Sequence, residues 1–522
     1  MLIQSTSSNV PQVLYTAAQV RQLDALTIAQ TEGGGYALMR LAGRAAFRHL
    51  LRHFPEAASI AVFCGGGNNG GDGYVIAEMA KQIGKAVRVI ALSNPEKLKG
   101  EAAEAWQNAS ESGIVAEMPE LSLIKEILND CDVVVDAMLG TGLTGHVRED
   151  YAGVIDVINL SGKPVLAVDI PSGLSADTGM MLGATVKAVI TSTFIGIKRG
   201  LLTGQSADVV GDLWFDDLGV SDDVFGCVLS SVTRSNFAES RTLLPTRDRT
   251  AHKGQCGHVL VVGGDSGFGG AVLMASEAAC RSGAGLVSCA TIPSHIGPGL
   301  ARVPEVMFRE VAHRQTLEEM LTSASVVALG PGLGSGPWGQ MCFQTALQYC
   351  QQYNMPLVVD ADGLNILAAN HLQLPEMTVL TPHLGEAARL LGCSVQDVMA
   401  DRFASAETLA EKYQATVVLK GAGTLVAASG NGNTRINVVA EHGNPGMAAG
   451  GMGDVLTGMV ASMIAQGMDS FNAACLAVSW HASSADMAAA KTGEPGLTAT
   501  DVIAGLGDAW KQAVTLQEAG RE

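Results

Sequence analysis

The chain has 522 residues, 47% of them hydrophobic and only 5% aromatic, with 62 glycines and a formal net charge of −18. Its length predicts two or three domains, and its acidic balance argues against nucleic acid or an anionic membrane as a partner. Ten scattered cysteines include no Cys-x-x-Cys pair, no apolar run could span a membrane and the first residues show no secretory signal, so we expect a soluble, cytoplasmic protein without disulfides or zinc.

The first part of the chain predicts two helices within residues 14–54, with Thr16 as the cap of the first. His49 and His53 stand four residues apart on the second helix, a spacing that can hold a metal. Because no third ligand is evident nearby, we expect both on a solvated helix face. The apolar run 59–64 that follows has the length of a strand.

A glycine-rich loop, 65–73, connects that strand to a helix predicted over 74–83. Strand, glycine-rich loop and helix in succession is the arrangement that holds phosphates in α/β folds. The loop matches neither the P-loop nor the G-x-G-x-x-G pattern. Asn68, Asn69 and Asp72 add polar side chains that a simple turn does not need, although a structural turn remains the alternative.

Three further strands are predicted at 86–92, 132–137 and 164–170, separated by helical stretches such as 97–112 and 151–160. This alternation predicts a parallel sheet covered by helices. Ligands of such sheets bind beyond the carboxyl ends of the strands. We therefore expect the site among the loops that leave them.

Three loops meet that expectation: 65–73, 136–145 and 169–173. Each carries a carboxylate or a run of glycines, and their convergence is stronger evidence than any one loop. Asp136 and Asp169 each end a strand, and helix capping is the alternative role for both.

Periodicity weakens between residues 211 and 244, and we place a domain boundary near residue 222. The second half begins again with an alternation of strands and helices. Strands are predicted at 257–262, 286–291, 325–329, 356–360, 377–380 and 416–420. Late helices are predicted at 452–466, 470–490 and 500–514. The two halves share an architecture but no motifs.

The stretch 444–458 combines several glycines with one carboxylate, Asp454, directly before an apolar helix. Glycines and the N–H groups of a helix N-terminus favour a bound anion such as a phosphate. An aspartate there would repel the anion unless it removes a proton from a hydroxyl during phosphoryl transfer. The alternative is a glycine-rich turn whose aspartate caps the helix.

These motifs resemble two known families. Residues 59–200, with the loops 67–73, 140–145 and 169–173, resemble the NAD(P)H-hydrate epimerases. Residues 250–515, with the motifs at 330–334, 381–383, 420–421 and 450–454, resemble the NAD(P)H-hydrate dehydratases of the ribokinase-like superfamily. In tandem they resemble the bifunctional NAD(P)H-hydrate repair enzymes. The resemblance implies an α/β protein with two three-layer αβα domains: a Rossmann-like epimerase domain over 1–221 and a ribokinase-like, ADP-dependent dehydratase domain over 222–522.

The implied activity is the repair of reduced nicotinamide cofactors that have added water across a ring double bond. The epimerase interconverts the R and S hydrates, and the dehydratase returns the S form to NAD(P)H at the expense of ADP, releasing AMP and phosphate. Since hydroxide is a poor leaving group, the hydroxyl is first phosphorylated, with Asp454 as the base and Mg²⁺ screening the phosphates of ADP.

The resemblance also implies site residues. In the dehydratase, the hydrate would contact Ala271, Gly334, His383 and Asp454. The nucleotide would contact Lys420, Gly421, Ala422, Gly423, Thr424 and Gly453. For His383 a capping or core role is equally consistent with the sequence.

In the epimerase, Asp169 is the candidate for proton transfer. The hydrate would be held by Asn68, Asn69, Gly70, Gly71, Asp72, Gly140, Thr141, Gly142, Leu143, Thr144, Gly145, His146 and Asp169. Asn69, Asp136 and Ser172 resemble potassium ligands, since all three offer oxygens. Lys198 follows a strand within 190–197, where a phosphate contact and a surface position are both open.

NADHX, NADPHX and ADP are the implied small-molecule partners, and a homo-oligomer, suspected to be a tetramer, is carried over from the family. The sequence does not decide between ADP and ATP. Two other functions stay open: a ribokinase-like small-molecule kinase with an N-terminal nucleotide-binding module, and an N-terminal half kept only for partner recognition.

Overall fold

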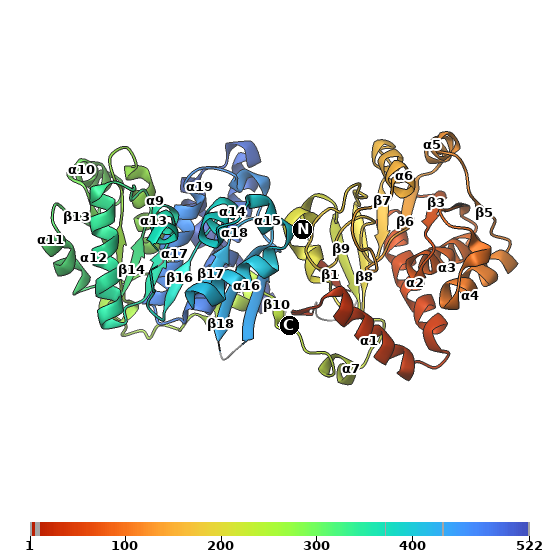
Figure 1. Cartoon of the computed structure of the whole chain (residues 1–522), viewed down its shortest axis with the longest axis horizontal. Helices are drawn as coiled ribbons and strands as arrows, with labels where there is room; N and C mark the ends of the chain where they lie inside the picture. The colour runs from red at the N-terminus through yellow and green to blue at the C-terminus, as the bar shows by residue number, and fades with distance from the viewer. Residues whose placement is uncertain (1–2, 6–10, 371, 431–432, 520–522) are drawn as a thin grey trace. The chain divides into compact units, whose positions relative to one another are not determined.

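The computed structural model describes residues 3–5, 11–370, 372–430 and 433–519. It divides into two compact units, Met1–Thr233 and Arg234–Glu522, drawn in red to yellow and in green to blue in Figure 1. Residue 222, where the sequence pattern weakens, begins the short helix α7 (Asp222–Gly226) of the first unit. Among the described residues, no helix is both long and apolar enough to cross a membrane.

The first unit is built on a parallel sheet with the strand order β1-β9-β8-β7-β6-β3-β4-β5. Its strands are β1 (Ile3–Ser5), β3 (Ser59–Cys64), β4 (Ala86–Ala91), β5 (Ala116–Glu117), β6 (Val133–Ala137), β7 (Val165–Val168), β8 (Ile190–Phe194) and β9 (Asp212–Asp216). A short antiparallel pair is formed by β2 (Val13–Leu14) and β10 (Val232–Arg234).

The longer helices of this unit are α1 (Ala17–Gln30), α2 (Gly34–His53), α3 (Asn68–Gln82), α4 (Gly100–Glu111), α5 (Leu121–Asp130) and α6 (Glu149–Leu160). Short 3₁₀ helices lie at Pro95–Lys97, Arg199–Leu202 and Gly204–Asp208. Thr16 caps α1 as predicted, its hydroxyl accepting a hydrogen bond from the backbone N–H of Gln19.

Both faces of the sheet are covered by helices. Neighbouring residues of a strand point to opposite faces, so two adjacent residues of β3 show what covers each one. Val62 packs with residues of α2 and α3 on one face, while Phe63 packs with residues of α5 and α6 on the other. The predicted three-layer αβα fold is therefore confirmed for this unit (Figure 1).

The second unit contains the strand order β13-β12-β11-β14-β15-β16-β17-β18-β19. The pairs from β13 to β17 are parallel, while β18 and β19 join antiparallel. The strands are β11 (His258–Val262), β12 (Leu286–Thr291), β13 (Met307–Glu310), β14 (Val326–Leu329), β15 (Leu357–Val359), β16 (Thr378–Leu380), β17 (Thr416–Leu419), β18 (Thr424–Gly430) and β19 (Asn433–Val439).

Helices flank this sheet as well. They are α8 (Phe237–Ser240), α9 (Gly269–Arg281), α10 (Ile296–Arg302), α11 (Arg314–Leu321), α12 (Pro337–Tyr353), α13 (Ala361–Asn370), α14 (Leu384–Leu391), α15 (Val395–Ala400), α16 (Arg402–Tyr413), α17 (Met452–Ala465), α18 (Ser470–Thr492) and α19 (Ala499–Ala519). Short 3₁₀ helices lie at Arg241–Leu243, Lys253–Cys256, Pro293–His295, Pro445–Met447 and Glu494–Gly496.

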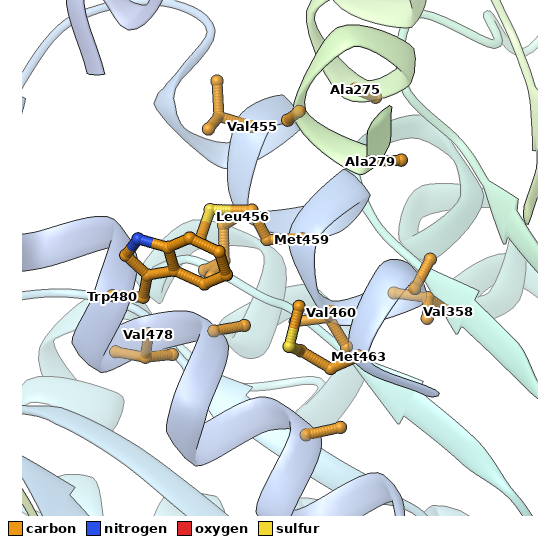
Figure 2. Packing of buried hydrophobic residues seen from close by; sticks show 14 of the residues in the cluster. Ala275, Ala279, Val358, Val455, Leu456, Met459, Val460, Met463, Val478 and Trp480 are labelled. Carbon is orange, nitrogen blue, oxygen red and sulfur yellow. The ribbon is translucent and has the colours of Figure 1, made fainter. Parts of the chain in front are cut away.

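Helix α17 is the centre of this unit's core. All its residues from Val455 to Ile464 are buried, against α9, α18 and the sheet (Figure 2). Gly458 allows the closest approach, because a Cβ atom there would lie 2.0 Å from the carbonyl oxygen of Ala275. A helix that is apolar on every side is held rigidly by its surroundings, which fixes the position of the residues in its first turn.

Some elements differ from the sequence expectations. Helix α3 begins at Asn68, so most of the predicted glycine-rich loop is its first turns. Strands β9, β18 and β19 and helix α5 were not predicted. β18 pairs with β17 and β19, and β9 lies between β1 and β8; pairing within the sheet stabilises such strands more than their own periodicity does.

Candidate active sites

A cavity of about 750 Å³ opens at the carboxyl ends of the first unit's strands. Most of the predicted epimerase residues line it: Asn68, Asn69, Asp72, Gly140, Thr141, Gly142, Leu143, Thr144, His146 and Asp169. Gly70, Gly71 and Gly145 do not line it. Gly70 and Gly71 are buried within α3, and a Cβ atom on Gly70 would lie 2.1 Å from the carbonyl oxygen of Gly65.

Asp169 and Lys198 form an ion pair in this cavity. Asp169 follows β7 with a left-handed φ of 66°, and its backbone N–H donates to the carbonyl of Ser192 at 2.7 Å. The Lys198 side chain is 1% exposed, and its ammonium also donates to Thr193 Oγ1 at 3.0 Å and to the Phe194 carbonyl at 3.3 Å. The surface position considered for Lys198, and the helix-capping role considered for Asp169, are therefore wrong.

Asp136 ends β6 and is fully buried. Its carboxylate accepts hydrogen bonds from Ser172 Oγ at 2.6 Å, from the Ser172 N–H at 2.8 Å and from the Met138 N–H at 3.2 Å, so it caps no helix. Burial raises the pKa of Asp136 to about 6, although these hydrogen bonds act in the opposite direction. Asn69 is nearly buried, and its amide nitrogen has no hydrogen-bond partner.

These residues suit a hard, weakly bound cation. The carboxylate of Asp136, the hydroxyl of Ser172 and the amide carbonyl of Asn69 all offer oxygen atoms, the ligands that a hard cation prefers. Among the described residues, no group of three or more His, Cys, Asp or Glu side chains is arranged to hold a metal ion. An alkali cation requires no such group.

Asp24 also lines this cavity, and sequence analysis did not identify it. It comes from α1, a helix without a recognisable motif. Burial raises the pKa of Asp24 to about 6, opposed by Lys198 and reinforced by Asp169. Burial, with Asp169 and Asp24 nearby, also raises the pKa of Asp72 well above its usual range.

His49 differs from its prediction. It is 1% exposed, its Nδ1 lies 2.8 Å from Ser192 Oγ, and its ring packs against Trp214. The expected solvated face is therefore wrong at this position, because α2 covers the sheet. Burial lowers the pKa of His49 to about 4.

The second candidate site lies at the N-terminus of α17. Gly451 is the N-cap residue, and Asp454 stands two residues inside the helix and makes no side-chain cap. The helix start is as predicted, and the capping alternative is wrong. Burial raises the pKa of Asp454 to about 7; Asp360, Asp362 and Glu386 add to the shift, and Lys420 opposes it.

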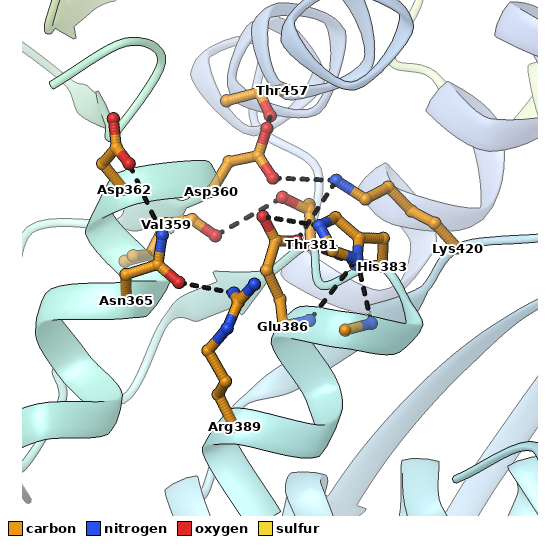
Figure 3. Close-up of polar contacts among 11 residues, drawn as sticks. Val359, Asp360, Asp362, Asn365, Thr381, His383, Glu386, Arg389, Lys420 and Thr457 are labelled. Atoms are coloured by element: carbon orange, nitrogen blue, oxygen red, sulfur yellow. Dashed lines mark hydrogen bonds and ion pairs between the residues drawn. The ribbon is translucent and has the colours of Figure 1, made fainter. Parts of the chain in front are cut away.

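Lys420 is paired with Asp360, at 2.9 Å (Figure 3). Among the described residues, Asp454 takes part in no ion pair. The other oxygen of Asp360 accepts a hydrogen bond from Thr457 of α17 at 2.8 Å. Burial alone would raise the pKa of Asp360, but Lys420 and Thr457 hold it below its usual value. Glu386 lies 3.8 Å from the same ammonium. Asp360 therefore links the exit of β17 to the helix that carries Asp454.

His383 and Gly334 belong to loops around this cluster. His383 caps α14, its Nδ1 accepting hydrogen bonds from the N–H groups of Gly385 and Glu386 at 2.9 and 3.4 Å, and its ring is half exposed (Figure 3). The capping role is thus confirmed. The N–H of Gly334 donates to Asp362 at 2.8 Å. Ala271 lies in α9 beside the loop of Gly332.

A buried arginine, Arg402, binds the backbone carbonyls of the predicted nucleotide loop. Arg402 is 3% exposed and donates to the carbonyls of Ala422, Leu419 and Lys420 at 2.5, 3.2 and 3.3 Å. The C=O and N–H of one trans peptide unit point in opposite directions. The N–H groups of Gly421 and Gly423 therefore point away from Arg402, as an anion-binding loop requires. Arg402 lies in no motif, and sequence reasoning missed it.

Comparison with known families covers both units. The NAD(P)H-hydrate dehydratase family matches residues 259–506, and the family described as YjeF-related protein N-terminus matches residues 35–200. A solved ribokinase-like superfamily protein of Enterococcus faecalis is similar to the chain at 28% identity and a TM-score of 0.50, over 55% of this chain and 97% of that one. The ribokinase-like fold expected for the second half agrees with this likeness.

Two curated relatives are similar over nearly the full length. The bifunctional NAD(P)H-hydrate repair enzyme Nnr of Coxiella burnetii is 44% identical, over 94% of this chain and 98% of the relative. The enzyme of that name from Escherichia coli is 43% identical, over 90% of this chain and 88% of the relative. At these levels of identity and coverage, the chain belongs to the family of bifunctional NAD(P)H-hydrate repair enzymes.

Proposed function

We propose that this enzyme interconverts the R and S hydrates of NADH and NADPH in its first unit and dehydrates the S form, with ADP as phosphoryl donor, in its second. Asp454 is the observation that carries the dehydratase assignment. It combines a helix N-terminus, a neighbouring lysine and a pKa near 7, the properties required of a base that acts beside a phosphoryl group.

In the dehydratase reaction, Asp454 accepts the proton of the hydrate's C6 hydroxyl as its oxygen attacks the terminal phosphorus of ADP, and AMP leaves. The phosphate then departs from C6, pushed by the lone pair of the ring nitrogen, and loss of a proton from C5 restores the double bond. The N–H groups at the start of α17, including Gly453, stabilise the phosphoryl group in transfer. Lys420 and the loop to Thr424 hold the nucleotide, and Ala271, Gly334 and His383 contact the hydrate.

When bound with ADP, Mg²⁺ supplies charge neutralisation of the phosphates. Mg²⁺ needs only one or two carboxylates when phosphate oxygens complete its coordination. Asp360 and Glu386 lie 2.9 and 3.8 Å from the ammonium of Lys420. This placement supports them as the carboxylates that would hold Mg²⁺ beside the phosphates.

In the epimerase reaction, Asp169 is the proton-transfer carboxylate, oriented by Lys198. Asn68, Asn69 and Asp72 of α3, the loop from Gly140 to His146, and Asp169 hold the hydrate against the cavity wall. Asn69, Asp136 and Ser172 would hold K⁺, which supplies a positive charge beside the substrate. Asn68, Asn69, Asp72 and Asp169 line one cavity, and Ser172 is hydrogen-bonded both to Asp136 and to Leu139 of the cavity wall, which supports this site.

We assign the epimerase domain to residues 1–221 and the dehydratase domain to residues 222–522; the two compact units divide later, after Thr233. All ten cysteines are free, as suits a reducing compartment, and we place the enzyme in the cytoplasm. A homo-oligomer, with a tetramer as the first candidate, is carried over from the family resemblance.

The test is to give the whole protein a mixture of R and S hydrates with ADP, with ATP or with neither, and to follow both epimers by chromatography. We expect both epimers to disappear with ADP, NAD(P)H and inorganic phosphate to form, and the epimers only to exchange without nucleotide. A stable phosphorylated product with no return of nicotinamide absorbance would support a small-molecule kinase instead.

A further inference from the structure

One face of α1 looks into the epimerase cavity. Val20, Arg21, Asp24 and Ile28 all line it, and their spacing of three and four residues places them on one side of the helix. Val20 is buried, and its apolar neighbour Leu23 is fully so. A carboxyl group among apolar residues on the buried side of a helix is unfavourable for folding. Asp24 therefore does not serve stability, and a functional role would explain its position.

The carboxyl group of Asp24 lies in the field of Lys198 and Arg21 but is not bonded to either. Within the described part of the chain, neither its carboxyl group nor that of Asp72 takes part in a hydrogen bond or ion pair, although both line the cavity. The three N–H bonds of the Lys198 ammonium are already directed to Asp169, Thr193 and Phe194. Lys198 therefore holds the side chain of Asp169 in place and makes no hydrogen bond to Asp24.

A second observation indicates that a ligand completes this wall. The amide nitrogen of Asn69 is buried and unpartnered, and Asn69 lines the same cavity. A buried amide group without a partner is costly, so a bound molecule that accepts its hydrogen bond would offset that cost.

Inversion at C6 needs one group that donates a proton and one group that accepts a proton. On one face, the C6–O bond breaks and the hydroxyl leaves as water after receiving a proton, while the ring-nitrogen lone pair forms a C=N bond. On the other face, a water molecule attacks C6, the C=N electrons return to nitrogen, and the water loses a proton. One proton is given, one is taken, and one water replaces another. Because the departing hydroxyl and the entering water lie on opposite faces of the ring, one carboxyl group cannot reach both oxygens, and inversion calls for one group on each face.

We propose that Asp24 is the second catalytic residue of the epimerase, acting as the acid that protonates the departing hydroxyl while Asp169 accepts the proton of the entering water, with the roles exchanged in the reverse direction. This inference rests on the proposed epimerase function of the cavity. Burial, which raises the pKa of Asp24 to about 6, keeps a share of the group protonated near neutral pH. The other charged or titratable groups around the cavity are Arg21, Asp72, Glu101, His146, Arg148, Tyr151, Asp169 and Lys198.

The test uses the full chain without nucleotide, so that no hydrate is consumed. Purified R hydrate is supplied, and its conversion to S is followed by chromatography for the wild type, Asp24→Asn, Asp24→Glu and Asp156→Asn, an exposed aspartate of α6 outside the cavity. We expect Asp24→Asn to lower kcat at least about 100-fold with little change in KM. Asp24→Glu should recover part of the rate, and Asp156→Asn should match the wild type.

Binding of the R hydrate, measured at equilibrium, reports whether the cavity of each variant is intact. The pH profile of kcat for Asp24→Glu should shift relative to the wild type, which a structural role would not cause. Asp24→Asn with kcat within about threefold of wild type, or with a loss confined to KM, would overturn the proposal. If the wild type itself exchanges no epimers, the proposed function of the cavity fails first, and that result is distinct.

Discussion

The two units each place one lysine among several carboxylates, but the lysines have different partners. In the first unit, Lys198 is bonded directly to the candidate catalytic residue, Asp169. In the second, Lys420 is bonded to Asp360, and within the described ranges no lysine or arginine forms an ion pair with the candidate base Asp454. Burial and the surrounding carboxylates then raise the pKa of Asp454 to about 7.

This difference agrees with the two chemistries. A group that removes a proton beside phosphate must be basic near neutral pH. Asp454 meets this condition because Lys420 is bonded to Asp360, so burial can raise the pKa of Asp454. In the first unit, the direct ion pair with Lys198 fixes the position of the Asp169 carboxyl group in the cavity. The same residue types therefore give different reactivity through their pairing.

The largest expected effect is that of Asp454→Asn on dehydration. Removing the base should lower nucleotide-dependent loss of the S hydrate by about 1000-fold or more, while epimer exchange continues. Release of inorganic phosphate and nicotinamide absorbance measure the first activity, and chromatography the second. Asp508→Asn, at an exposed position of α19, is the matched control. Loss of both activities in a folded variant would contradict two independent sites.

Asp169→Asn should give the reverse pattern with a somewhat smaller loss. We expect epimer exchange to fall roughly 100-fold or more, so that the S hydrate is repaired with ADP and the R hydrate accumulates. Separating the two epimers during a single time course checks this. Consumption of both at the wild-type rate would exclude Asp169 from the chemistry.

The raised pKa of Asp454 predicts a pH-dependent stability. A group that holds its proton more tightly in the folded protein stabilises it fully below the unfolded pKa of about 4, and that contribution is lost as pH rises through about 7. Asp454→Asn removes the effect. Relative to wild type, the variant should therefore gain roughly 2 kcal/mol more stability at pH 8.5 than at pH 5.5. Thermal unfolding at both pH values measures the stability of the unit that carries Asp454, identified as the unfolding transition that nucleotide shifts. If the stability difference between the variant and the wild type is the same at pH 5.5 and 8.5, the pKa of Asp454 is not raised.

The smallest expected effect concerns Arg402. Arg402→Met would release the carbonyls that orient the nucleotide loop, and we expect the KM for ADP to rise about tenfold with a smaller change in kcat. Arg402→Lys should recover only part of this, since lysine lacks the planar fork. Arg247→Met is the control, because Arg247 also binds a carbonyl, that of Gly283, but away from the loop. An unchanged KM for ADP would show that the loop keeps its shape unaided.

Much of the fold could be predicted from the sequence because its signals are local. The buried strands, the glycine-rich turns and the helix starting near Asp454 are each encoded within about a dozen neighbouring residues. Asp136 and Asp169 were identified for the same reason, since each directly follows a strand. Family membership, reached first by resemblance, is confirmed by the comparisons.

The rest of each site depends on contacts that no local pattern encodes. Lys198 meets Asp169 across 29 residues, and Lys420 meets Asp360 across 60. Asp24 lies in a helix without a motif, and it can be recognised as a cavity residue only from the packing of α1 beside the cavity. Arg402 is likewise distant in sequence from the motif that it supports.

The complete hydrogen bonding of Lys198 has a consequence for substrate discrimination. An ammonium group whose N–H bonds all end on protein oxygens cannot hold the extra phosphate that distinguishes NADPH from NADH. Any such preference in the epimerase falls to the exposed arginines at the rim, Arg21 and Arg148. Charges in open solvent are screened within about 8 Å at physiological ionic strength, so the selectivity between the two cofactors should weaken as salt is added.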